Sequence, residues 1–234
     1  YTFVTSLGEE SPPAPLSAQV DHSSGVTITV SGFSAAPAGR AITHRRIYRS
    51  VTDYAGNAVL HFVAEIPLAT TSLAWDDITY PVVEPIATAD FDAPPDAIEG
   101  FTTMPNGIIA GFVGRELMFC EPYRPHAWPI KYRLSVDYEI MGPAAFGSTL
   151  AVLTKGTPYI SQGTHPENMV LTKVEQNLPC IAADGIVDMG YAALYPSHTG
   201  LVSISAQGAQ VVSAQLFDRD GWQALHPSTF RASH

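Results

Sequence analysis

The feature that most limits what this chain can fold into is a short glycine-containing turn between two apolar segments, which occurs three times. The turns contain Gly114, Gly156 and Gly200, so they are 42 and then 44 residues apart. Two apolar segments joined by two turn residues predict a β-hairpin. A repeat of about 40–50 residues with several strands in each copy is typical of β-propeller blades. We therefore predict that the second half of the chain is a repetitive β scaffold.

Each copy of the repeat has room for four strands. The central hairpins are predicted to turn at residues 114–115, 156–157 and 199–200, with a lead-in strand before each hairpin and a more polar outer strand. Convincing helical periodicity is absent, so we predict an all-β chain with only short helical turns. The predicted lead-in strands are residues 98–101, 138–141 and 186–189, and the outer strands are residues 132–136, 169–174 and 209–214.

The first part of the chain contains short segments rich in β-branched and aromatic residues, separated by Gly, Pro, Asn or Asp. Short strands at this spacing predict a β-sandwich. With its proline-rich entry and a strand that ends in Trp75, the stretch of residues 16–84 resembles a fibronectin type III module. The closing strands expected after Asp77 are not evident, whereas residues 1–13 look like such a closing pair. The N-terminal strand therefore either completes this sandwich or belongs to a preceding copy.

These observations divide the chain into three parts. Residues 1–15 are the strand and linker of an upstream or completing module, and residues 16–84 are the sandwich. Residues 85–234 are a propeller-like domain of about three blades. Proline-rich residues 79–97 mark a linker or crossover. Because the chain starts at Tyr1 inside a predicted strand, we expect a piece of a longer polypeptide, with missing blades upstream or in another subunit.

The composition argues against several classes of protein. The 12 Lys and Arg against 22 Asp and Glu give a formal net charge of −10, so tight binding of nucleic acid is not expected. No apolar run approaches the roughly 20 residues that cross a bilayer, so membrane insertion is not expected. Cys120 and Cys180 lie in or beside apolar stretches. We predict that they are buried thiols, and neither a disulfide framework nor a zinc site is indicated.

The sequence contains no recognisable catalytic, cofactor-binding or metal-binding motif, and we predict no cofactor. The histidines lack metal-ligand spacing, and no nucleophile elbow, phosphate loop or dinucleotide-binding turn occurs. Propeller glycosidases place two carboxylates on neighbouring inner strands, but no carboxylate here recurs at a matching position of the repeat. A calcium site at Asp90, Asp92 and Asp96 lacks the glycine-punctuated spacing of known loops. The candidate carboxylates, interpreted as solvated strand ends and turn caps, are Glu116, Glu121, Asp137, Glu139, Asp184 and Asp188.

Aromatic residues and prolines are dense in residues 121–129. Such a segment is either a platform for a sugar or a peptide, or a stiff loop between blades whose rings pack against the scaffold. The candidate interaction residues in it are Tyr123, Arg124, His126 and Trp128.

Residues 105–114 and 119–129 resemble a pattern found in virion proteins of tailed bacteriophages, and residues 154–163 continue in the same register. Those proteins also open with a strand like residues 1–13 and contain an Arg-Ile-Tyr-Arg segment like residues 46–49. The resemblance implies a structural component of the tail, such as a tail-tube, nozzle or tail-tip subunit. It supplies no catalytic residues.

The same resemblance implies assembly in the host cytoplasm with other virion proteins and with copies of the chain, around the DNA exit path. The net negative charge would let DNA pass without sticking, so any contact with translocating DNA is expected to be passive. Two other classes stay open. A receptor- or glycan-binding propeller module would show an exposed aromatic patch. A secreted glycoside hydrolase would need two inward carboxylates about 5–10 Å apart in a deep pocket.

Overall fold

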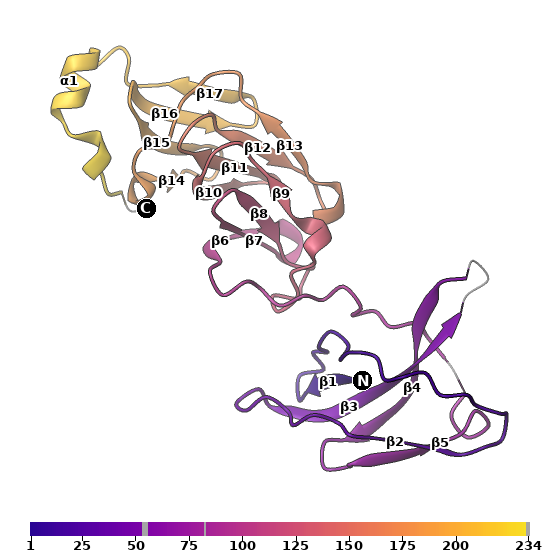
Figure 1. The fold of residues 1–234 in the computed structure, drawn as a ribbon. Helices are drawn as coiled ribbons and strands as arrows, with labels where there is room; N and C mark the ends of the chain where they lie inside the picture. The colour runs from indigo at the N-terminus through magenta and orange to yellow at the C-terminus, as the bar shows by residue number, and fades with distance from the viewer. Residues whose placement is uncertain (53–55, 82, 233–234) are drawn as a thin grey trace. The chain divides into compact units, whose positions relative to one another are not determined.

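The computed structural model describes residues 1–52, 56–81 and 83–232, and the chain divides into two compact units, Tyr1–Phe91 and Asp92–His234. The regular secondary structure of both units consists mainly of antiparallel strands, with only short helical turns (Figure 1). The predicted all-β class is therefore confirmed. The first unit is a small β-sandwich, and the second consists of blade-like four-stranded sheets. Within the described ranges, no helix is long and apolar enough to cross a membrane.

The first unit packs a three-stranded sheet against a two-stranded one. β1 (Thr2–Thr5), β3 (Ile42–Thr52) and β4 (Ala58–Pro67) form an antiparallel sheet in the order β1-β3-β4. β2 (Ile28–Ser31) pairs with β5 (Ser72–Trp75). Since alternate side chains of a strand point to one face, each sheet presents an apolar face to the other. The buried residues of this shared core are Ile47, Val63, Ala64, Ile66, Leu73 and Trp75.

The boundary between the two units lies after Phe91 in the chain, whereas the sequence predicted it after residue 84. Residues beyond that point still belong to the sandwich because they run along the edge of β4. Phe62 N donates to Glu84 O over 2.8 Å, and Ile86 N donates to Leu60 O over 2.8 Å. The proline-rich segment therefore begins as part of the first unit.

The N-terminal strand completes this sandwich, which was one of the two alternatives. β1 lies beside β3 in the same unit, with Thr2 opposite Arg46. Residues 9–14 return along the other side of β1, where Ser11 N donates to Phe3 O over 2.9 Å. In immunoglobulin-like sandwiches the last two strands share a sheet with the third strand. Here that closing pair comes first in the chain.

A buried carboxylate fixes this closing pair to the sheet. Glu10 is 5% exposed. Its Oε1 accepts from Thr2 Oγ1 over 2.7 Å and from the Tyr48 hydroxyl over 2.5 Å, and its Oε2 lies 2.8 Å from Arg46 Nη1. Burial and this carboxylate together raise the pKa of Tyr48. Three donors therefore converge on one carboxylate, which meets the requirement that a buried charge be paired and hydrogen-bonded.

The second unit contains three antiparallel sheets, each with its four strands in chain order. The predicted central hairpin supplies the second and third strands of every sheet. The first sheet consists of β6 (Glu99–Met104), β7 (Ile108–Val113), β8 (Glu116–Phe119) and β9 (Leu134–Ser135). The second consists of β10 (Ile140–Phe146), β11 (Thr149–Thr154), β12 (Tyr159–Gln162) and β13 (Val170–Lys173). The third consists of β14 (Val187–Asp188), β15 (Ala193–Ser197), β16 (Gly200–Ser205) and β17 (Gly208–Val211).

Only two of the three central hairpins have a two-residue turn. Gly114 begins the first one, in the left-handed conformation with φ of 58°. In the third, Ser197 pairs with Gly200, so the turn residues are 198–199, one position earlier than predicted. The prediction for the second hairpin is wrong, because four residues separate β11 from β12. The Thr154 hydroxyl stabilises this longer loop by hydrogen bonds to the loop backbone.

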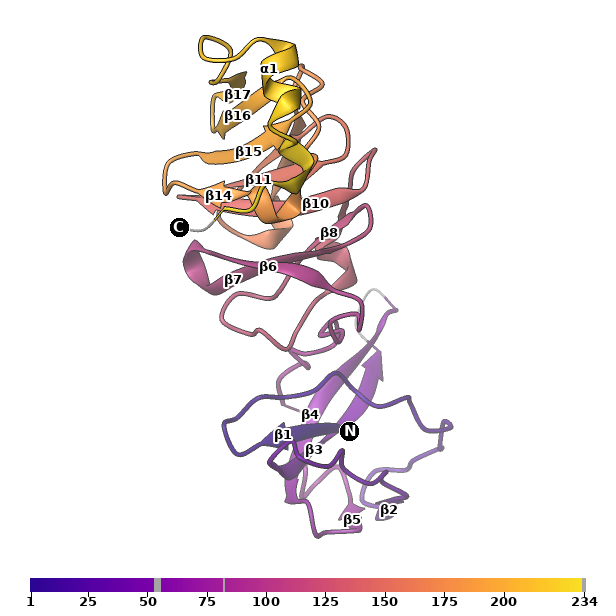
Figure 2. The same cartoon turned by 90° about the vertical axis from the view of Figure 1, so that its left-hand side faces the viewer.

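The three sheets stack face to face in an open row and do not close into a propeller (Figures 1 and 2). Phe119, Leu150 and Val152 are fully buried between the first and second sheets. Leu153 and Tyr195 are fully buried between the second and third. Stacked repeats of this kind bury a continuous core that no single sheet could form.

Each end of the row carries one buried tryptophan. Trp128 forms a buried cluster with Met118 and Cys120 on the first sheet. At the other end, α1 (Arg219–Ala224) lies beyond the third sheet (Figure 1). Its Trp222 is 3% exposed, and Trp222 Nε1 donates to Ser197 O over 2.8 Å. The chain therefore covers part of both outermost sheets with its own segments.

Candidate functional site

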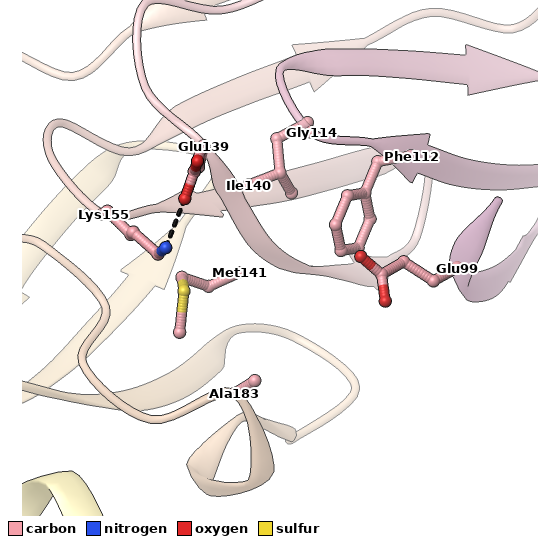
Figure 3. Close-up of a pocket in the computed structure, with 8 residues that line it drawn as sticks. All are labelled: Glu99, Phe112, Gly114, Glu139, Ile140, Met141, Lys155 and Ala183. Carbon is pink, nitrogen blue, oxygen red and sulfur yellow. Dashed lines mark hydrogen bonds and ion pairs between the residues drawn. The ribbon is translucent and has the colours of Figure 1, made fainter. Parts of the chain in front are cut away.

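A pocket of about 420 Å³ opens in the second unit, where the first strands of neighbouring sheets come together. This volume lies within the range of small-molecule sites. β6 contributes Glu99, β10 contributes Ile140 and Met141, and the turn that precedes β14 contributes Ala183 (Figure 3). The residues that line it are Glu99, Phe112, Gly114, Glu139, Ile140, Met141, Lys155 and Ala183.

Two irregular strands border this pocket. The pairing of β6 with β7 shifts register after Glu99, where Gly100 has φ of +66°. A Cβ at Gly100 would lie 2.3 Å from the Phe112 ring, so only glycine fits this bend. The pairing of β10 with β11 also shifts register, between Ile140 and Gly142. Such bulges re-aim side chains and are common next to binding sites.

The charged groups of the pocket differ in whether they have a partner. Glu139 and Lys155 form an exposed ion pair (Figure 3). The hydrogen bond and charge of Lys155 lower the pKa of Glu139. Glu99 lies beside the Phe112 ring, and within the described residues no side chain forms an ion pair or hydrogen bond with its carboxylate. The pocket therefore holds one carboxylate that is compensated and one that is not.

Of the six carboxylates that the sequence singled out, only Glu139 lines the pocket. Lys173 pairs with Asp137 and lowers its pKa. A general acid of a glycosidase needs a raised pKa, so these two shifts run in the opposite direction. The other candidate carboxylates have partners outside the pocket. Two form ion pairs: Glu116 lies 3.4 Å from Arg133, and Asp184 lies 3.6 Å from Arg231. Two accept hydrogen bonds: Glu121 from the Tyr132 hydroxyl over 2.7 Å, and Asp188 from Gly190 N over 2.7 Å.

The aspartates considered for calcium do not form a metal site. Throughout residues 1–52, 56–81 and 83–232, no three His, Cys, Asp or Glu side chains are arranged to hold a metal ion. Asp92 Oδ2 instead accepts a hydrogen bond from Ile130 N over 3.1 Å, and Asp92 O accepts from Trp128 N over 2.8 Å. Asp92 therefore fixes the start of the second unit to the loop that carries Trp128.

The candidate interaction residues are divided between the surface and the core. Tyr123 is 77% exposed and has φ of 59°, and its N–H donates to Gly107 O over 3.0 Å. Arg124 is exposed and His126 is half-buried. Trp128 is 2% exposed, with its Nε1 donating to the Pro125 carbonyl over 2.9 Å. Trp128 therefore packs against the scaffold, as expected for a stiff loop between blades. Tyr123 is instead exposed, so a partner could contact it.

Both cysteines are buried free thiols, as the sequence predicts. Burial raises the pKa of Cys120, and it raises the pKa of Cys180 to about 11 from the ordinary 9.0. We expect both thiols to react with a disulfide reagent at pH 8 far more slowly in the folded chain than in denaturant, because the thiolate is the nucleophile. Replacing Cys120 or Cys180 by serine, one at a time, shows which reaction rate belongs to which thiol. Equal rates in the folded and denatured chain would contradict the prediction.

The sequence reasoning missed Glu99, Met141 and Lys155 as lining residues. An available signal was glycine inside an apolar strand pattern, at Gly100 and Gly142, since such a glycine often marks a bulge. No protein-family model matches the chain, and no curated protein is similar to it in sequence. The fold and the geometry of the site therefore have to support any proposal about function.

Proposed function

We propose that the chain is a structural component of a bacteriophage tail, which assembles with other virion proteins and with copies of itself around the DNA exit path. The observation that carries this proposal is the stacked β scaffold of three four-stranded antiparallel sheets. Lys155 and Lys173 pair with Glu139 and Asp137, and they lower the pKa of both carboxylates. Exposed ion pairs of this kind add little to stability, and the lowered pKa values give no support to acid catalysis.

The architecture supports the same role. Rows of stacked sheets are rigid, and rigid subunits with two different contact surfaces close into rings when the rotation between neighbours allows it. The formal charge of −10 disfavours the release of counterions from DNA, so DNA could pass such a ring without being held. The resemblance of residues 105–129 to tailed-phage virion proteins points to the same class.

The experiment is purification of particles from a phage that encodes this chain. We expect the chain to sediment with intact virions through a density gradient, in a fixed ratio to the major capsid protein, as measured by quantitative mass spectrometry. Recovery of the chain only from the soluble fraction, with none in purified particles, would overturn the proposal and favour a secreted hydrolase.

A phage with a stop codon in this gene separates the structural role from receptor binding. If the chain is part of the tail scaffold, electron microscopy will show particles with incomplete tails. If the chain only recognises a receptor or a glycan, tails will assemble normally and the particles will fail to adsorb. The specific observation that supports this second function is the exposed ring of Tyr123, which a receptor or a glycan could contact.

A further inference from the structure

We propose that the pocket between β6 and β10 binds an alkylammonium group, as carried by a lysine side chain or a free diamine, with Glu99 as the counter-ion. This inference does not depend on the proposed role in a virion. It concerns the chemistry that the pocket recognises, whatever assembly contains the chain.

The charge of the pocket selects a cation. Lys155 neutralises Glu139, whereas Glu99 has no partner side chain within the described residues. One negative charge in the lining is therefore uncompensated. Glu99 is exposed at the pocket and lies opposite Phe112 in the pairing of β6 with β7, so an incoming group can reach its carboxylate (Figure 3).

The rest of the lining suits an aliphatic stem. Ile140 and Met141 lie between Glu99 and the ion pair of Glu139 with Lys155 (Figure 3). Methylene groups that contact these side chains and Phe112 would leave water as the ammonium reaches Glu99. A free inorganic cation would gain nothing from these apolar walls, so the lining favours an organic ion.

The backbone holds the binding group in place. Glu99 precedes a bulge in which Gly100 has a left-handed conformation, and a Cβ there would collide with Phe112. The backbone position of Glu99 is therefore set by two paired strands and not by a loop. Sites on strands are held more accurately than sites on loops.

The test is an NMR titration of the full chain with two probes, Nα-acetyl-lysine methylamide and 1,5-diaminopentane. We expect saturable shifts of the Glu99 and Met141 backbone amides, which weaken at high salt. The uncharged norleucine analogue of the first probe should produce no such shifts. Shifts with the lysine probe point to a protein side chain as the natural ligand, and shifts with the diamine alone point to a free amine. No saturable shift with either probe would overturn the proposal.

Two variants separate specific binding from a general effect of charge. Glu99→Gln should weaken binding about fivefold, the loss expected for one partly exposed ion pair, without a change in melting temperature. Glu175→Gln removes an exposed carboxylate outside the pocket and should leave the affinity unchanged. Equal weakening by both variants, or equal binding of the norleucine analogue, would show that Glu99 is not the counter-ion.

Discussion

Glu10→Ala is expected to destabilise the first unit by about 1–3 kcal/mol, because it leaves the buried hydroxyl of Thr2 without its acceptor. Arg46, whose side chain is 37% exposed, would keep its ion pair with Glu65, whereas the hydroxyls of Thr2 and Tyr48 would lose their acceptor. An unpaired buried donor costs more than a lost hydrogen bond at the surface. The effect should be confined to the sandwich, since all these residues belong to Tyr1–Phe91.

Glu65→Ala is the matched control for this prediction. Glu65 Oε2 lies 2.8 Å from Nε of the same Arg46, the same distance as Glu10 Oε2 from Nη1, but its side chain is 38% exposed. Exposed pairs contribute at most about 1 kcal/mol, so this variant should be close to wild type. Hydrogen exchange followed by mass spectrometry measures protection of residues 1–14 and 42–52 in each variant. Equal loss of protection in the two variants would show that burial does not decide the strength of the pair.

Trp222→Ala is expected to release the C-terminal segment from the third sheet. Trp222 is 3% exposed, its ring contacts Phe217 and Phe230, and its Nε1 donates to Ser197 O. Replacing a buried tryptophan by alanine costs about 3–5 kcal/mol. A loss of that size makes local opening more than about a hundred times more frequent.

The readout is the rate of amide exchange in residues 213–232, compared with that of β11 in the second sheet. We expect fast exchange in the segment and little change in β11, because the core between the first two sheets does not include Trp222. Leu225→Ala, at a position that is 45% exposed, should have an effect within about 0.5 kcal/mol. Uniform loss of protection over the whole second unit would mean that the segment and the sheets unfold together.

The repeated hairpins could be predicted from the sequence because their signal is local. A continuous apolar segment stands on each side of a turn that contains glycine, and the register within a hairpin follows from the turn. The second turn was mispredicted because Gly156 suggested a two-residue loop. The Thr154 hydroxyl instead bonds to the loop backbone, and a threonine is equally common within strands.

The sequence did not decide whether the N-terminal strand completes this sandwich, because that pairing depends on residues far apart in the chain. Nothing local shows that Glu10 would be buried, because Glu9 beside it is a residue of the same type and is only half-buried. The identity of its partners became clear only when β1 lay beside β3. Long-range pairing of this kind has no periodic pattern in the sequence.

The pocket was unpredictable for a different reason. It arises where two strands depart from regular pairing, at Gly100 and near Gly142, so the regular pattern used to place the strands conceals it. Glycine inside a strand signals a bulge, but it does not say which side chain the bulge will redirect. Only the folded structure shows that, among the residues it describes, Glu139 has an ion-pair partner and Glu99 has none.

The order of strands in the sandwich affects how this unit can form on the ribosome. Thr2 is synthesised well before Arg46, which lies opposite it in the finished sheet. A two-stranded hairpin is at best marginally stable by itself in water, so residues 1–14 must wait for β3 and β4 to emerge. During that interval the apolar side of Val4 stays uncovered, and the emerging chain is open to capture by chaperones until the third strand arrives.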